Sequence, residues 1–113
     1  MFATSEITAC LEAYAALEAP ARETERAAVK QVLEALKKAA PGRSVELRIP
    51  PYAAVQIVEG VNHRRGTPSA VVEMSARSLL LLAVGNLSWD AAVRNATVTA
   101  SGERSNLSHL FPC

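Results

Sequence analysis

The chain has 113 residues, a length typical of one domain. Half of the residues are apolar and only 4% are aromatic, so a core has to be built mainly from Leu, Val and Ile. Twelve Lys and Arg against eleven Asp and Glu give a net charge of +1. This balance excludes the broad positive field that binding to nucleic acid or to an anionic membrane surface requires. We therefore predict a single domain, 1–113, with no nucleic-acid partner.

The first residues, the longest apolar stretch and the cysteines give expectations about the cellular location. Glu6 and Glu12 stand where a signal peptide needs a basic start and an unbroken apolar run. The longest apolar stretch, 79–84, is six residues, far below the ~20 that cross a bilayer as a helix. Cys10 and Cys113 lack metal-ligand spacing, and reduced thiols are usual in the cytosol. We expect a cytoplasmic protein without stable membrane insertion and without a disulfide framework.

Two helices are predicted in the first forty residues. Between residues 5 and 17, apolar residues recur every three or four positions on one helical stripe: Ile7, Cys10, Leu11, Tyr14 and Leu17. A second helix, 21–40, is predicted after Ala19-Pro20 and ends before Pro41-Gly42. We expect Glu34 to pair with Lys38 on its outer side. Its buried face is formed by Val29, Val32, Leu33, Leu36 and Ala40.

Four strands follow from alternation of apolar and polar residues. Val45, Leu47 and Ile49 alternate with charged residues, which is typical of a strand with one buried face. Pro50-Pro51 interrupts the ladder, and 52–59 predicts the second strand of a hairpin. The remaining two strands are predicted at 70–74 and at 97–101, the latter ended by Gly102.

Two short helices are predicted between the last two strands. Ser75 is a suitable N-cap for a helix over 76–84, and Gly85 is able to end it in the left-handed conformation. Ser88 caps the next helix, which runs from Trp89 to about Asn95. The tail contains Leu107, Leu110 and Phe111, which we expect to form one helical turn packed on the sheet. This order of elements predicts an α+β fold with a mostly antiparallel sheet.

Residues that support catalysis or metal binding are scarce. A nucleophile needs a base within reach and a group that orients the base. His63 lies in a polar loop and His109 in the tail, with no Gly-x-Ser-x-Gly motif and no phosphate-binding loop. Zinc ligands usually come as close pairs, which this chain lacks. We therefore predict no enzyme activity, no metal site and no cofactor.

The helix over 76–84 contains four consecutive leucines, Leu79 to Leu82, which cover all sides of a helix. They cannot all face one sheet. Three arrangements are open: a partner chain covers the surplus, neighbouring elements enclose the helix, or the leucines line an apolar cavity that binds a ligand.

The region 85–102 resembles the sterol carrier protein family, the non-specific lipid-transfer fold, and in particular its small stand-alone bacterial branch. The motif places a Gly at a helix end, an inward Ala in a short helix and a strand closed by Gly, positions held here by Gly85, Leu87, Ala92, Val98 and Gly102. Residues 43–52 and 65–68 resemble further stretches of this branch, so the likeness extends over 43–112. Ala96 departs from the pattern, because members usually have Gly there. The helix within residues 1–19 is extra to the shortest members.

The resemblance implies a curved, mostly antiparallel sheet of four to five strands, covered by helices that enclose a tunnel for a sterol or an acyl chain. We therefore hypothesise non-catalytic binding or carriage of an apolar ligand between the sheet and the helices over 76–95. The expected lining residues are Val55, Ile57, Val72, Leu80, Leu81, Trp89, Val93 and Val98. The alternative is an interaction module that has lost the tunnel and forms a homodimer through the 79–84 helix.

The loop 60–68 carries the densest cluster of cations, at residues 63–65. If the loop borders the mouth of the tunnel, Arg65 is able to bind an anionic head group in a bidentate manner, with the Thr67 hydroxyl as a second contact. The other interpretation is a solvated loop. We include Arg65 and Thr67 among the expected ligand-binding residues.

Overall fold

The computed structural model describes residues 4–60, 70–102 and 104–113. The expected ligand contacts Arg65 and Thr67, and also His63, lie outside the described residues. Within the described residues the chain forms, in order, α1 (Ser5–Ala15), α2 (Arg22–Ala39), β1 (Val45–Ile49), β2 (Ala53–Ile57), β3 (Ala70–Met74), α3 (Ala76–Val84), α4 (Trp89–Arg94), β4 (Val98–Gly102) and the 3-10 turn η2 (Ser108–Leu110).

The four described strands form one sheet in the order β2-β1-β3-β4. β1 pairs antiparallel with β2, β3 pairs antiparallel with β4, and β1 pairs parallel with β3. The predicted α+β class with a mostly antiparallel sheet is therefore confirmed, with one parallel pairing at its centre. β1 and β3 bury alternate residues, as the period of two predicted.

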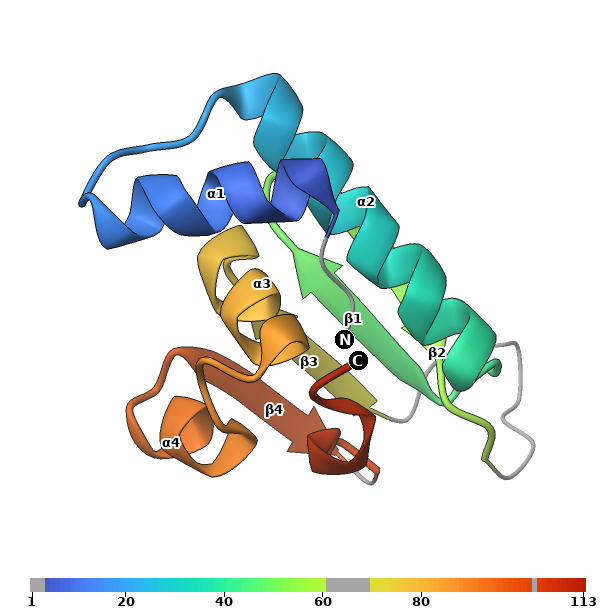
Figure 1. Cartoon of the computed structure of the whole chain (residues 1–113). Helices are drawn as coiled ribbons and strands as arrows, with labels where there is room; N and C mark the ends of the chain where they lie inside the picture. Colours follow the sequence, from blue (N-terminus) through green and yellow to red (C-terminus); the bar gives the residue numbers. More distant parts are fainter. Residues whose placement is uncertain (1–3, 61–69, 103) are drawn as a thin grey trace.

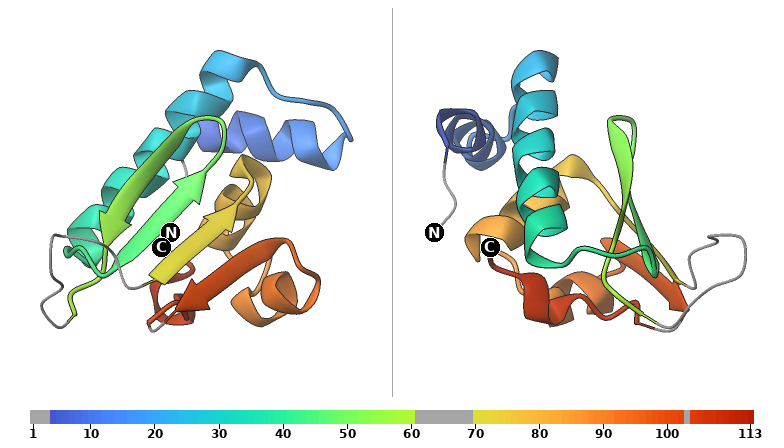
Figure 2. Two further views of the ribbon diagram at one scale, coloured as in Figure 1. Left: turned by 180° about the vertical axis from the view of Figure 1, so that it is seen from behind. Right: turned by 90° about the vertical axis from the view of Figure 1, so that its right-hand side faces the viewer.

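The helices lie on one face of the sheet (Figures 1 and 2). α2 packs along β2, α4 packs beside β4, and α3 lies between them and also contacts α2. α1 forms a further layer outside α2 and α3 and packs on both. The sequence expectation of a helix-covered sheet is thus met by two layers of helices over part of the sheet.

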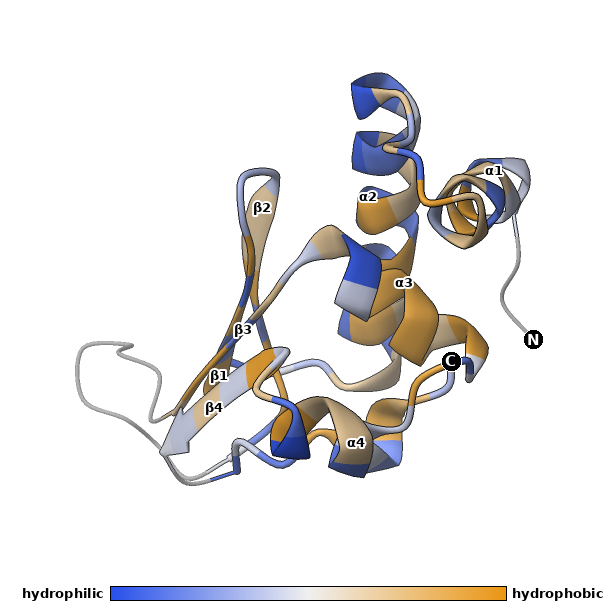
Figure 3. Cartoon of the chain, turned by 90° about the vertical axis from the view of Figure 1, so that its left-hand side faces the viewer, coloured by the Kyte–Doolittle hydropathy of each residue, from blue (hydrophilic) through white to orange (hydrophobic). Residues whose placement is uncertain are grey.

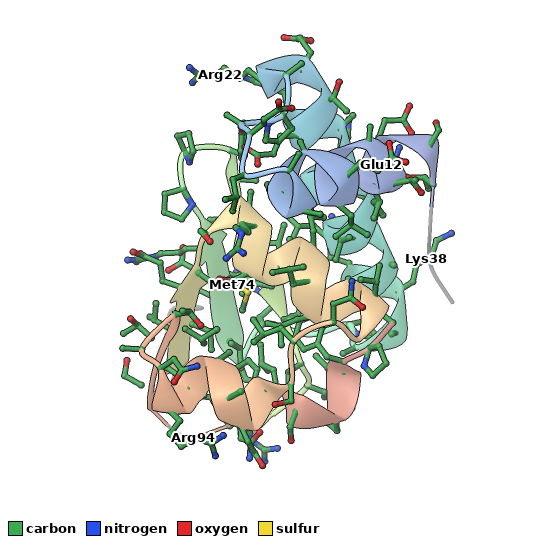
Figure 4. The ribbon with its side chains drawn as sticks, turned by 60° about the vertical axis from the view of Figure 1, so that its left-hand side comes forward. Glu12, Arg22, Lys38, Met74 and Arg94 are labelled. Atoms are coloured by element: carbon green, nitrogen blue, oxygen red, sulfur yellow. The ribbon has the colours of Figure 1, made fainter. Side chains whose placement is uncertain are left out.

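The interior between the sheet and the helices is one apolar cluster. Figure 3 shows that most of α3 is hydrophobic. Leu79, Leu80 and Leu82 are 0% exposed, while Leu81 is partly exposed. In Figure 4 the side chains of Glu12, Arg22, Lys38 and Arg94 extend away from the molecule, whereas Met74 lies between the sheet and α3. The run of leucines is therefore explained by the enclosure of α3 by its neighbours, and a partner chain is not needed to cover it.

Single residues in the sequence explain where α3 begins and ends and where the backbone turns. The Ser75 side chain accepts a hydrogen bond from the Ser78 N–H and begins α3, and Gly85 ends it with φ 86°. Gly42 lets the chain after α2 pass the end of β2, because a Cβ there would lie 2.2 Å from the Val58 carbonyl. Ala96 has φ 59°, which is in the left-handed region that favours Gly. This is the position at which members of the resembled family usually have Gly.

Two details of the sequence prediction are wrong. Leu17 is 93% exposed, because α1 ends at Ala15 and the Leu17 backbone turns into the left-handed region. Glu34 contacts Lys37 at 3.7 Å rather than Lys38, because the two side chains are adjacent at i,i+3.

The tail forms the predicted helical turn, η2, and the end of the chain contacts the helices α3 and α4. The Phe111 ring stacks on Trp89 of α4, and the Cys113 N–H donates to the Ala83 carbonyl of α3. Leu107, at the start of the tail, is fully buried in the core. The tail therefore covers the junction of α3 and α4.

Candidate ligand-binding site

Five of the eight expected apolar lining residues belong to the buried interior cluster. Ile57, Val72, Leu80 and Val98 belong to the one buried cluster and are between 0% and 4% exposed. The same cluster contains the buried side chains of α2 and α3. These four residues are therefore buried, and none of them lines the hollows described below.

The other expected residues lie at different places. Val55 is partly buried on edge strand β2 and packs against the cluster. Leu81 is partly exposed on α3, and Val93 is 45% exposed on α4. Trp89 is the fifth member of the buried cluster, is 8% exposed and stacks against Phe111 of the tail. The structure therefore separates the expected site into an inner group and several surface positions.

A surface groove of about 350 Å³ lies between α2 and β2. Its volume is within the range of small-molecule sites. The residues that line it are Arg26, Val29, Lys30, Leu33, Glu34, Tyr52, Ala53 and Val55. It opens at the border between the helix layer and the sheet, on the side of edge strand β2.

The groove combines an apolar floor with a charged rim. Val29 and Leu33 of α2 are almost fully buried and form the floor together with Val55. Arg26 and Lys30 are exposed on the next helical row, one turn apart. This arrangement suits an apolar chain that ends in an anionic group, because the chain is removed from water while the head meets cations at the surface.

Tyr52 lines the groove and shares the Glu25 carboxylate with Tyr14. Tyr52 donates a hydrogen bond to Glu25 Oε1 at 2.6 Å, and Tyr14 donates to the other carboxylate oxygen of Glu25. The Arg26 guanidinium lies 5.9 Å from the centroid of the Tyr52 ring. The hydrogen bond to Glu25, followed by burial, raises the pKa of Tyr52 above its ordinary value. Tyr52 therefore forms a fixed, neutral wall of the groove.

Sequence reasoning found only Val55 of the groove residues. The helical spacing of Val29 and Leu33 predicted their burial, but it did not indicate that a gap separates them from the edge strand. The exposed pair Arg26 and Lys30, one turn apart beside that apolar row, is a signal that the sequence analysis did not use. This pair indicates a groove only once it is known that β2 lies beside α2.

Two other hollows lie elsewhere on the surface. One, of about 320 Å³, is lined by Gly85, Leu87, Ser88, Trp89, Asp90, Ser108, Phe111 and Pro112. It includes the Trp89–Phe111 stack, with ring centroids 6.2 Å apart. The other, of about 340 Å³, is lined mostly by polar residues at the ends of β3 and β4. Neither combines an apolar floor with cations as the groove does.

Other chemistry is sparse in the described part of the chain. Residues 4–60, 70–102 and 104–113 contain no group of three His, Cys, Asp or Glu side chains placed to hold a metal ion. Burial raises the pKa of both the Cys10 and the Cys113 thiols, so neither is poised as a nucleophile. Among the helices described, none is long and apolar enough to cross a membrane.

Comparison with known proteins identifies the family. The model of the family of bacterial SCP orthologs, where SCP denotes sterol carrier protein, matches residues 21–113. The chain belongs to this family, which connects it with lipid binding or transfer. The matched region contains α2 and all the described strands, whereas α1 precedes it. The resemblance inferred from residues 43–112 is thereby confirmed.

A solved structure gives a more distant likeness. The crystal structure of sterol carrier protein 2 like 2 from Aedes aegypti aligns with a TM-score of 0.47 and 15% sequence identity, covering 75% of this chain and 94% of that chain. A search of the curated proteins found no match.

Proposed function

We propose that this chain binds and carries an apolar small molecule, a fatty acyl chain or a sterol-like lipid, without catalysing a reaction on it. The observation that carries the proposal is the groove between α2 and β2, with its apolar floor and its two cations. Membership of the sterol carrier family supports the same ligand class. The proposed site consists of the groove, and the buried residues Ile57, Val72, Leu80 and Val98 stay a prediction.

The expected affinity follows from the area that the ligand buries. About twelve methylenes at ~0.8 kcal/mol each provide ~10 kcal/mol before the costs of association. At the low end of these costs, ~4 kcal/mol, about 6 kcal/mol remains for the apolar part, which corresponds to an affinity between millimolar and micromolar. A charge-assisted contact to the head group adds ~1.5 to 3 kcal/mol where it is well ordered. The cations at the rim therefore decide whether binding becomes micromolar.

Two places are proposed for an anionic head group. Arg26 and Lys30 lie at the rim of the groove. Arg65 and Thr67 belong to the loop that the sequence analysis assigned to the mouth of the site, and they stay a prediction. The two assignments differ in which cation, when it is replaced, weakens the binding of the anionic ligand.

The ligand class is tested by extraction of the protein from its own host followed by mass spectrometry, and by titration with fluorescent fatty acyl and sterol probes. We expect an enriched apolar molecule and saturable probe binding at micromolar concentration. The absence of an enriched lipid together with the absence of probe binding would contradict the proposal.

The head-group assignment is tested with Arg26→Ala, Lys30→Ala and Arg65→Ala. Each variant is titrated with a fatty acid and with the neutral alcohol of equal chain length. Loss of affinity for the acid alone, reduced by added salt, assigns the head group to the cation removed. Lys38→Ala is the matched control, because Lys38 is exposed on α2 and does not line the groove. Equal losses for acid and alcohol in all variants would refute a charged head-group contact.

A further inference from the structure

The hollow of about 320 Å³ lies where the end of α3, the start of α4 and the tail meet. Its lining residues are different from those of the groove between α2 and β2, so the hollow is a separate site. Its volume is at the lower end of the range of small-molecule sites. A ligand for this hollow is therefore small, and its chemistry follows from the side chains that line it.

One wall of the hollow is apolar and partly aromatic. It is formed by Leu87, Trp89, Phe111 and Pro112. The two rings are nearly parallel, with planes at 9° and centroids 6.2 Å apart. Trp89 is 8% exposed and Phe111 is partly exposed, so the Phe111 ring is the more accessible of the two. The face of an aromatic ring carries partial negative charge and attracts cations.

The charge of the hollow comes from Asp90. Among the described residues that line it, Asp90 is the one with a formal charge. Its side chain is exposed and forms no ion pair or hydrogen bond with the residues that the structure describes. Arg94, one helical turn later on α4, extends away from the molecule in Figure 4 and does not line the hollow. An unpaired carboxylate beside an apolar wall favours a cation that also has apolar groups.

The ends of two helices have opposite effects on a cation in the hollow. α3 ends at Gly85, so the partial negative charge of its last turn lies beside the hollow. α4 begins at Trp89, and the partial positive charge of its first turn is unfavourable to a cation. The Ser88 hydroxyl accepts a hydrogen bond from the Ala91 N–H, which satisfies one of the free N–H groups of that turn. Because the two helix ends oppose each other, the full charge of Asp90 determines the sign of the ligand.

We propose that this hollow binds a small organic ammonium ion, with its alkylated nitrogen against the Phe111 ring and its charge beside Asp90. Alkyl groups on the nitrogen contact the apolar wall and need no hydrogen-bond acceptor, whereas a bare ammonium ion is strongly hydrated. Asp90 repels an anion. The hollow therefore selects the opposite charge from the groove, whose rim contains Arg26 and Lys30.

The first test is a titration of the full chain with choline and with the neutral alcohol that has a tert-butyl group in place of the trimethylammonium group. Trp89 lines the hollow and is the one tryptophan of the chain, so its fluorescence reports occupancy. We expect saturable choline binding at millimolar concentration and about twofold to fivefold weaker binding of the alcohol, the range for a cation–π contact at an exposed site. Added salt should weaken the binding of choline alone. The absence of saturable choline binding, or equal binding of both probes, would overturn the proposal.

A parallel titration distinguishes a free ammonium ion from the head group of a lipid. Short-chain phosphatidylcholine below its micellar concentration carries the same ammonium group with a phosphate beside it. Binding as tight as that of choline assigns the head group of a lipid, and weaker binding assigns a free ion, because Asp90 repels the phosphate. These titrations do not depend on the fatty acid site, so a failure of either proposal leaves the other intact.

The last test replaces the two groups that recognise the cation. Asp90→Asn should weaken choline binding about twofold to fivefold, the range for an exposed ion pair, and leave binding of the alcohol unchanged. Phe111→Leu keeps an apolar side chain and removes the ring, so it should weaken binding of choline more than binding of the alcohol. Glu73→Gln is the matched control, because Glu73 is exposed on β3 and does not line the hollow. Unchanged choline binding by Asp90→Asn, or an equal loss in Glu73→Gln, would refute the site.

Discussion

Replacement of Leu80 by Ala tests whether the space between the sheet and α3 is a packed interior. Leu80 is 0% exposed and lies in the one buried cluster. The change removes three carbon atoms, which costs ~2.4 kcal/mol of transfer free energy at ~0.8 kcal/mol each. Because the neighbours relax only partly, the cavity left behind raises the expected loss to about 3 to 4 kcal/mol.

The matched control is Leu81→Ala on the same helix. Leu81 is partly exposed and lies outside the buried cluster, so its truncation should cost less than ~1 kcal/mol. Urea unfolding followed by circular dichroism and by Trp89 fluorescence measures both values. Equal losses for the two variants would refute the packed interior, as would a Leu80→Ala loss below ~1.5 kcal/mol, which would indicate a loosely filled space lined by Leu80.

Three further predictions concern single residues. Burial, and then the hydrogen bond to Glu25, raise the pKa of Tyr14 above its ordinary value of 10.0, so its contribution to stability is fully present below pH 10 and is lost as the pH rises. Urea titrations should show that Tyr14→Phe loses less unfolding free energy than the parent between about pH 9 and about pH 11. Ala96→Gly should raise the unfolding free energy by roughly 0.5 to 1 kcal/mol, because Gly adopts the left-handed conformation without steric cost; a loss would contradict this. Burial raises the pKa of both thiols, so mass spectrometry after alkylation at about pH 8 should show Cys113 modified slowly and Cys10, which is fully buried, more slowly still; rates equal to those of the unfolded chain would refute it.

The elements of the fold were largely predictable because their signals are local. Alternation in 45–49 and the cap at Ser75 each depend on a few neighbouring residues, and the structure places β1 and α3 where they were predicted. The position of Leu17 was not predictable from the helical stripe, because the period continues past the point where the backbone turns. Periodicity indicates which side of a helix is apolar and does not determine where the helix ends.

The candidate site was less predictable because it depends on which elements are neighbours. Leu80 and Val93 were both expected to line a cavity, yet Leu80 is buried in the core and Val93 is exposed on α4. The sequence shows that both are apolar, while their surroundings follow from the packing of α3 between α1, α2 and the sheet. Arg26 was missed for the same reason, since its role depends on the distant strand β2.

The most direct test of the proposed function is an NMR titration of the isotope-labelled protein with a medium-chain fatty acid, which observes methyl groups and backbone amides residue by residue. We predict saturable shifts centred on Val29, Leu33 and Val55, the floor of the groove, with smaller changes at the buried residues of the core. The same titration of Leu33→Trp, which fills the groove, should show weaker binding. Shifts confined to the hollow around Trp89, or the absence of saturable shifts, would contradict ligand binding between α2 and β2.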